Sequence, residues 1–288
     1  MTSIITGSEG FIAKKLIEKL DGEEDLIGLN RDAGDLSIIS LHDLINTETK
    51  VDMVFHLAAR TFVPNAWKKP EEFIKENIAS TLNVLNYCRL NKIPLLYMSA
   101  YIYGDQQELP IKENAAVLPS NPYAHSKLLC EQICEYYVQA FSLDITILRP
   151  FNVYGSGQDK NFLIPEIIEK IKTKDKLVVD YLKPRRDYIH VEDLVEAIIA
   201  SSKIIKGFQV YNIGSGFSVS VKNIIELIEE IIGRSLEIEE RNIIRNNELM
   251  DVVADISKAS DSFSWKPKLT LKEGLKRILL QEGLCSKN

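Results

Sequence analysis

Short runs of apolar residues alternate with longer helical patterns through the first half of the chain. Five runs have the length of a buried strand: residues 3–6, 25–30, 52–58, 94–100 and 144–150. Apolar residues at helical spacing lie between them, for example Leu16, Ile17 and Leu20 after the first run. Strands that alternate with helices predict an α/β fold with a doubly wound parallel sheet. In such a sheet, ligands bind at the carboxyl ends of the strands.

A glycine turn follows the first of these runs. Gly7 and Gly10 precede an apolar helical segment, and the small residue Ala13 lies three positions after Gly10. Glycines allow the backbone to approach a pyrophosphate closely, and the amides at a helix N-terminus attract its negative charge. The spacing Gly-x-x-Gly-x-x-Ala differs from the dinucleotide fingerprint Gly-x-Gly-x-x-Gly. Alone, it fits an ordinary strand-to-helix turn equally well.

Three polar residues further along have the chemistry of an acid/base site. Tyr123 and Lys127 are four residues apart in a predicted helix, so their side chains share a face, and Ser99 lies at the end of the fourth apolar run. The unperturbed pKa of a phenol is about 10, and a nearby cation favours the phenolate. We therefore expect Lys127 to move the pKa of Tyr123 toward the range in which it exchanges protons with a substrate hydroxyl.

Eight segments, in the same order, resemble the nucleotide-sugar epimerase, dehydratase and reductase branch of the extended short-chain dehydrogenase/reductase family. They are residues 6–13, 56–59, 77–83, 99–104, 121–127, 149–155, 186–191 and 211–216. The resemblance implies a nicotinamide cofactor, a nucleoside-diphosphate-sugar substrate and a catalytic triad of Ser99, Tyr123 and Lys127. In that triad Tyr123 is the acid/base at the sugar oxygen, Ser99 hydrogen-bonds the same oxygen, and Lys127 holds the nicotinamide ribose.

The resemblance also implies where the cofactor lies. Its expected contacts are in the glycine turn, after the second, third and fifth strands, and on two helices: Gly7, Gly10, Phe11, Ile12, Asn30, Arg31, Asp35, Leu36, Leu57, Ala58, Ala59, Asn77, Tyr123, Lys127, Pro150, Asn152 and Val153. An acidic residue at the end of the second strand would favour NAD, because it repels a 2′-phosphate. Asn30 is neutral there and Arg31 offers a phosphate partner, although Asp32 could neutralise it. We expect NADP(H) slightly ahead of NAD(H).

Substrate contacts are implied after the fourth and fifth strands and in the C-terminal half: Ser99, Ala100, Tyr101, Asn152, Arg186 and Arg245. Guanidinium groups bind a diphosphate through charge-assisted hydrogen bonds. The resemblance gives that role to Arg186. Arg245 is the second candidate, with Glu248 where the family often has Asp. For Tyr101, core packing fits as well as a place in the sugar pocket.

The residues after Ser99 bear on the reaction. Dehydratases of the family carry an Asp-Glu pair immediately after the catalytic Ser or Thr, whereas this chain has Ala100 and Tyr101. Reduction of a 4-keto sugar nucleotide and 4-epimerisation both fit the three polar residues. We favour reduction, because exchangeable NADPH suits a net reduction and because residues 30–36 and 66–70 resemble the 6-deoxy-4-keto-hexose reductases. A catalytically silent nucleotide-binding protein of the same fold is a further alternative.

Composition argues against several classes of protein. The 288 residues, 45% of them hydrophobic, suffice for one large core with an appended lobe. A net charge of −6 without a basic tract argues against nucleic-acid binding. No apolar run approaches the roughly 20 residues that a membrane span needs. Because a strand begins almost at once, we expect no signal peptide and a cytoplasmic protein. The four cysteines are not clustered with histidines, so we expect reduced thiols and no metal.

The motifs also predict how the chain divides. We expect residues 1–152 to form a Rossmann-like cofactor domain, with 187–214 returning to it. Residues 153–186 and 215–288 would form a smaller C-terminal substrate-binding lobe. Two predicted helices, within 71–90 and 124–141, carry more apolar residues than one buried face requires. The family often pairs these helices between subunits, so the resemblance implies a homodimer.

Overall fold

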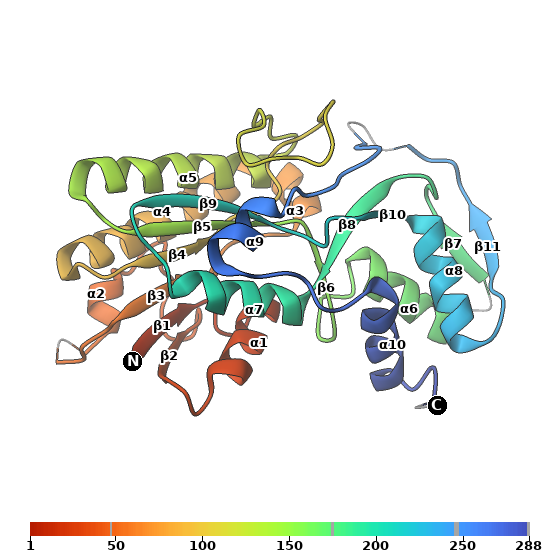
Figure 1. Cartoon of the computed structure of the whole chain (residues 1–288), viewed down its shortest axis with the longest axis horizontal. Helices are drawn as coiled ribbons and strands as arrows, with labels where there is room; N and C mark the ends of the chain where they lie inside the picture. The colour runs from red at the N-terminus through yellow and green to blue at the C-terminus, as the bar shows by residue number, and fades with distance from the viewer. Residues whose placement is uncertain (47, 174–175, 245–247, 287–288) are drawn as a thin grey trace.

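Within the residues that the structure describes, which are 1–46, 48–173, 176–244 and 248–286, six parallel strands form a central sheet in the order β2-β1-β3-β4-β5-β9 (Figure 1). In this computed structural model the strands are β1 (Thr2–Thr6), β2 (Asp25–Leu29), β3 (Met53–His56), β4 (Leu95–Met98), β5 (Ile145–Pro150) and β9 (Phe208–Ile213). The first five coincide with the five apolar runs, which confirms the predicted parallel sheet. Strand order reverses at β1, where such folds place their ligands.

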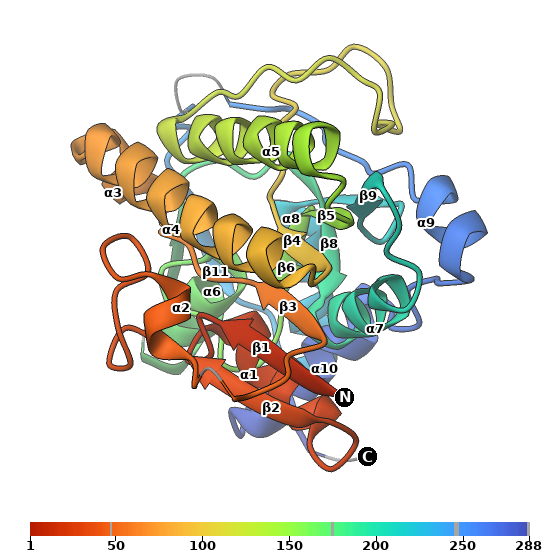
Figure 2. The ribbon, with the colours of Figure 1, turned by 90° about the vertical axis from the view of Figure 1, so that its left-hand side faces the viewer.

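Helices cover both faces of this sheet (Figure 2): α4 (Pro70–Asn91) and α5 (Pro122–Phe141) on one face, α1 (Phe11–Leu20) and α7 (Val191–Ser202) on the other. Successive strand residues point to opposite faces. Ile4 therefore packs with the residues under α4 and α5, whereas Ile5 packs with those under α1 and α7. Burial on both sides explains why the strands have continuous apolar sequences.

Three short helices lie at the margins of the sheet. α2 (Leu41–Leu44) and α3 (Val63–Lys68) pack against α4, and α9 (Ser257–Phe263) packs against β9. Ala259 and Trp265, in and just after α9, are buried in the core under α1 and α7. The C-terminal segment of the chain therefore contributes to the core on this face of the central sheet.

A second core lies beside the sheet, to its right in Figure 1. It is formed by α6 (Leu163–Thr173), α8 (Val221–Ile232), α10 (Leu271–Gln281) and the strands β6 (Asn152–Tyr154), β7 (Lys176–Val179), β8 (Arg185–His190), β10 (Ser218–Ser220) and β11 (Glu237–Glu240). Strand β8 pairs with β6 and β10, and β7 pairs with β11. The division of the chain into two lobes stays a prediction. β8 has residues in both cores, Ile189 in the larger and Tyr188 against the smaller, and Ala259 of α9 lies in the larger core.

A buried ion pair ties α5 to the sheet. The guanidinium of Arg149 on β5 donates to both carboxylate oxygens of Glu131 on α5, at 2.5–3.2 Å, and the two side chains are only 7% and 5% exposed. Arg149 also donates to the Tyr103 hydroxyl (2.8 Å), which in turn donates to Asn212 on β9 (2.6 Å). Burial opposes the charge on Arg149, but the hydrogen bonds and charge of Glu131 outweigh it and raise the pKa of Arg149.

Two further properties concern membranes and metals. None of the helices in the described ranges is long and apolar enough to cross a bilayer. The described His, Cys, Asp and Glu side chains form no cluster of three or more that could hold a metal ion. Cys88, Cys130 and Cys134 are free and buried, and Cys285 is free and half-buried.

Candidate active site

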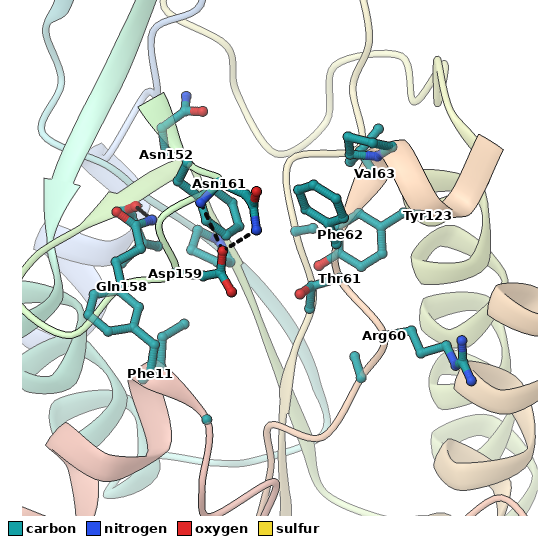
Figure 3. Close-up of a pocket in the computed structure, with 18 of the residues that line it drawn as sticks. Phe11, Arg60, Thr61, Phe62, Val63, Tyr123, Asn152, Gln158, Asp159 and Asn161 are labelled. Carbon is teal, nitrogen blue, oxygen red and sulfur yellow. Dashed lines mark hydrogen bonds between the residues drawn. The ribbon is translucent and has the colours of Figure 1, made fainter. Parts of the chain in front are cut away.

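A cavity of about 1310 Å³ runs along the carboxyl ends of the central strands and continues toward the smaller lobe. Every residue predicted to contact the cofactor lines it, and so does every predicted substrate contact within the described ranges. Arg245 lies outside those ranges. Figure 3 shows Phe62, Val63 and Tyr123 on one side of the cavity and Gln158, Asp159 and Asn161 on the other. The fold thus brings residues from both lobes to one site.

The glycine turn between β1 and α1 forms one end of the cavity. Gly7 has a φ of +70°, and a Cβ there would lie 2.9 Å from the backbone of Ala58 after β3. Any side chain at this position would therefore be strained and would push the two strand ends apart. α1 begins at Phe11 without a side-chain cap, so its first amides are available to an anion. This cradle fits the pyrophosphate of a dinucleotide.

A buried hydrogen-bond network shapes the segment after β3. The Thr6 hydroxyl accepts from the amides of Leu57 and Ala58 at 3.2 and 3.1 Å, and its oxygen lies 2.7 Å from Nδ1 of His56. Burial lowers the pKa of His56 to about 3, and the charge of Lys127 adds to this effect. His56 is therefore neutral at physiological pH and has a structural part in the site.

Asn77 on α4 also positions this segment. Its side-chain oxygen accepts from the Arg60 amide (2.8 Å), and its nitrogen donates to the Ser126 hydroxyl (2.9 Å) and to the Arg60 carbonyl (3.2 Å). Asn77 lines the cavity as predicted. Because its amide is already engaged, we propose that it orients the segment after β3 and the catalytic helix.

Ser99, Tyr123 and Lys127 all line the cavity. Asn121 caps α5 by accepting from the Ala124 amide (2.9 Å), which sets the first turn that carries Tyr123. The Lys127 ammonium donates to the Met98 carbonyl at the end of β4 (2.7 Å) and to the Tyr97 hydroxyl (3.2 Å). The Ser99 hydroxyl is buried and has no hydrogen-bond partner among the described residues. Such an orphaned group is costly unless a ligand satisfies it.

The pKa shifts of Tyr123 and Lys127 differ from those expected from the spacing of the two residues. Burial raises the pKa of Tyr123, and Cys130 adds to the rise. Burial also lowers the pKa of Lys127 to about 8. The expected lowering of the Tyr123 pKa by Lys127 is therefore absent, because desolvation of the phenol dominates and the ammonium is bound to Met98 and Tyr97.

Tyr101 presents its ring to the cavity. Its hydroxyl donates to the Gly104 carbonyl, and its ring packs edge-on against Phe151, with the centroids 5.2 Å apart. Tyr101 therefore packs in a small aromatic cluster and also lines the cavity, and its place in the sugar pocket stays a prediction. Ala100 and Tyr101 leave no carboxylate directly after Ser99.

Arg186 reaches the cavity from β8 but is not free. It forms an ion pair with Glu248 at 2.5 Å, and it donates to the Leu249 carbonyl (2.5 Å) and the Arg185 carbonyl (2.9 Å). A diphosphate that binds here would have to compete with the Glu248 carboxylate. The Asn152 side chain is held only weakly, by a 3.4 Å hydrogen bond to the Asp187 carbonyl.

Arg60 is a cavity residue that the sequence analysis missed. It follows Ala59 directly, at the end of the third strand, and its side chain pairs with Glu76 on α4 (2.5 Å). The available signal was a charged residue immediately after the predicted Leu57, Ala58 and Ala59 contacts.

Comparisons with known proteins agree with this geometry. The sequence model of the NAD dependent epimerase/dehydratase family matches residues 3–214. The GDP-6-deoxy-D-mannose reductase of Pseudomonas aeruginosa is 30% identical over 96% of this chain and 95% of its own. A putative UDP-glucose 4-epimerase of Methanocaldococcus jannaschii is 29% identical over 96% of both. The structure of RMD from Pseudomonas aeruginosa complexed with NADPH superimposes with a TM-score of 0.88 and 31% identity over 97% of each chain.

Proposed function

The chain belongs to the NAD dependent epimerase/dehydratase family, and from this premise we propose that it reduces the 4-keto group of a nucleoside-diphosphate 6-deoxyhexose with NADPH. Relatives in this family act on nucleotide sugars, and the reduction of a 4-keto group is our specific proposal for this chain. The orphaned Ser99 hydroxyl supports a substrate oxygen bound at this point, and the lack of a carboxylate directly after Ser99 argues against dehydration. Reduction is favoured over epimerisation by Arg31, which lines the cavity after β2 and offers a partner to the 2′-phosphate of an exchangeable NADPH. The relative from Pseudomonas aeruginosa, which is named as a reductase of a 6-deoxy sugar nucleotide, supports it.

The three polar side chains divide the chemistry of the reduction. A bound nicotinamide supplies the hydride to the sugar carbon. Ser99 donates a hydrogen bond to the carbonyl oxygen, which satisfies its own buried hydroxyl. Tyr123 donates a proton to the same oxygen as it becomes an alkoxide, and a cation beside the phenol favours the phenolate that this step leaves. Two donors of Lys127 are engaged by Met98 and Tyr97, and the third is left for a ribose hydroxyl.

The walls of the cavity suit a 6-deoxy sugar. Phe62 and Val63 face the cavity near Tyr123 (Figure 3), and Tyr101 is a further aromatic residue of the cavity lining. An apolar wall favours a methyl group over a hydroxymethyl group, whose hydroxyl would lose its hydrogen bonds to water. We propose that Arg186 binds the substrate diphosphate, which would take the place of the Glu248 carboxylate. Arg245 stays a predicted second partner of the diphosphate.

The function is tested by mixing the enzyme with stoichiometric NADPH and a 4-keto-6-deoxy sugar nucleotide. We expect the absorbance of the reduced nicotinamide to fall in proportion to the sugar reduced. A 4-epimerase is the second candidate, favoured by the epimerase name of one relative and by the identical needs of its chemistry. Interconversion of UDP-hexose epimers without added cofactor, together with no NADPH oxidation, would establish the epimerase and overturn the reductase.

We also propose a homodimer formed through α4 and α5. Most apolar residues of these helices face the core, but Leu90, Tyr136 and Phe141 are 62%, 59% and 45% exposed. We expect light scattering at micromolar concentration to give twice the mass of the chain. In a two-fold symmetric interface each substitution acts twice, so Tyr136→Glu should shift the mass to that of a monomer. A monomeric mass for the unsubstituted protein contradicts the proposal.

A further inference from the structure

Two arginines at one end of the cavity share a single carboxylate oxygen. Arg31 follows β2, Arg60 follows β3, and both line the cavity. Oε2 of Glu76 on α4 lies 2.9 Å from a terminal nitrogen of Arg31 and 2.5 Å from Nε of Arg60. Oε2 of Glu72, one turn earlier on α4, lies 3.2 Å from Nη1 of Arg60. Glu76 therefore bridges residues from two different strand ends.

Arg60 is the less exposed of the two arginines and has more contacts. Its backbone is fixed by Asn77, its guanidinium lies 5.7 Å from the Phe73 ring centroid, and its side chain is 29% exposed. The Arg31 side chain is 66% exposed and has Glu76 as its ion-pair partner, not the Asp32 suggested by the sequence. Asp32 accepts instead from its own neighbour Asn30, at 3.5 Å.

Arg31, Arg60 and Glu76 lie where the adenosine ribose of a bound dinucleotide is expected. The glycine turn at Gly7 fits the pyrophosphate, and the end of β2 is where a dinucleotide in such a sheet places its adenosine ribose. A 2′-phosphate on that ribose is a dianion, and two guanidiniums from different strands are suited to bind it by charge-assisted hydrogen bonds. In the structure the Glu76 carboxylate takes up those hydrogen bonds.

We propose that Glu76 is a specificity-determining residue, a resident counterion that a 2′-phosphate must displace from Arg31 and Arg60. NAD(H) leaves the Arg31–Glu76–Arg60 bridge intact. NADP(H) gains two guanidinium partners but breaks the bridge and brings its phosphate close to the freed carboxylate, which is repulsive. The bridge thus reduces the preference for NADP(H) and lets both cofactors bind. The inference rests on the cofactor binding of the proposed function and is independent of the reaction catalysed.

The test compares Glu76→Gln with Glu71→Gln, an exposed residue of the same helix outside the cavity. Calorimetric titration gives the Kd of NADPH, NADH and the fragment 2′,5′-ADP. We expect Glu76→Gln to lower the Kd of NADPH and of 2′,5′-ADP by about tenfold, which corresponds to about 1.4 kcal/mol of binding free energy. The Kd of NADH should change by less than about threefold. Glu71→Gln should change none of them.

A second variant protects the test against a folding defect. Arg60→Met should raise the Kd of NADPH by about tenfold or more and leave the Kd of NADH nearly unchanged, because the substitution removes only the contact to the 2′-phosphate. Unchanged NADPH affinity in Glu76→Gln, or an equal change for both cofactors in either variant, would overturn the role of Glu76. An unsubstituted protein that binds neither nicotinamide would overturn the proposed function as well, so the two failures are distinguishable.

Discussion

Tyr123→Phe lowers kcat by about 10²-fold or more, because it removes the proposed proton donor and keeps the ring. No described residue hydrogen-bonds the Tyr123 hydroxyl, so its loss leaves no partner unsatisfied and the fold should remain intact. The Kd of the cofactor should stay within about threefold of the unsubstituted value, which is less than 1 kcal/mol. The measurement is a steady-state assay of NADPH oxidation, paired with calorimetric titration of the cofactor.

The matched control is Tyr136→Phe, a tyrosine of the same helix outside the cavity, where the substitution keeps the ring at the proposed dimer interface. It should retain full turnover. Near-normal turnover in Tyr123→Phe would remove Tyr123 from the mechanism. A large loss of cofactor affinity would assign the residue to binding instead.

Glu131→Gln destabilises the protein by about 3–5 kcal/mol, because it leaves Arg149 charged, buried and without its counterion. Gln has nearly the shape of Glu, so packing changes little and the lost charge dominates. The Tyr103 hydroxyl and the Glu113 carbonyl still accept from Arg149, but neither carries a compensating negative charge at these hydrogen bonds. Urea unfolding at neutral pH measures the free energy of unfolding directly.

Glu135→Gln, an exposed position one turn further along α5, is the control and should stay within about 0.5 kcal/mol of the unsubstituted protein. A loss below about 1 kcal/mol in Glu131→Gln would mean that the pair contributes no more than an exposed one. Because α5 also carries Tyr123 and Lys127, this ion pair links the stability of the helix to the geometry of the site.

The sheet and the position of the site were predictable because both follow from local patterns. Each buried strand is an apolar run, and parallel strands bring their carboxyl ends to one edge. Gly7, Ser99 and Tyr123 could therefore be placed in one cavity although they are far apart in sequence. The close approach of the Ala58 backbone to Gly7 is a second reason for a glycine there, and the sequence did not reveal it.

The partners of the charged side chains could not be predicted. Glu76 meets Arg31 and Arg60 only because α4 packs across the ends of β2 and β3. Arg186 was expected to be available to a diphosphate, but Glu248 neutralises it across the smaller lobe. Such pairings depend on tertiary packing that no local pattern encodes.

Burial was the other property that the sequence did not reveal. The spacing of Tyr123 and Lys127 suggested a phenol with a lowered pKa, whereas desolvation raises the pKa of Tyr123. The sign of the shift depends on how far the fold removes the phenol from water, which the spacing of the two residues does not show.

The central claim is hydride transfer from a nicotinamide to the sugar carbon, and isotope transfer measures it most directly. The enzyme is given NADPH that carries deuterium on the transferable position of the nicotinamide, together with a 4-keto-6-deoxy sugar nucleotide. We predict that mass spectrometry finds a reduced sugar nucleotide that has gained the deuterium, with one NADP⁺ formed for each product. A product without deuterium, or unchanged NADPH with the sugar nucleotide interconverted between epimers, would contradict the account.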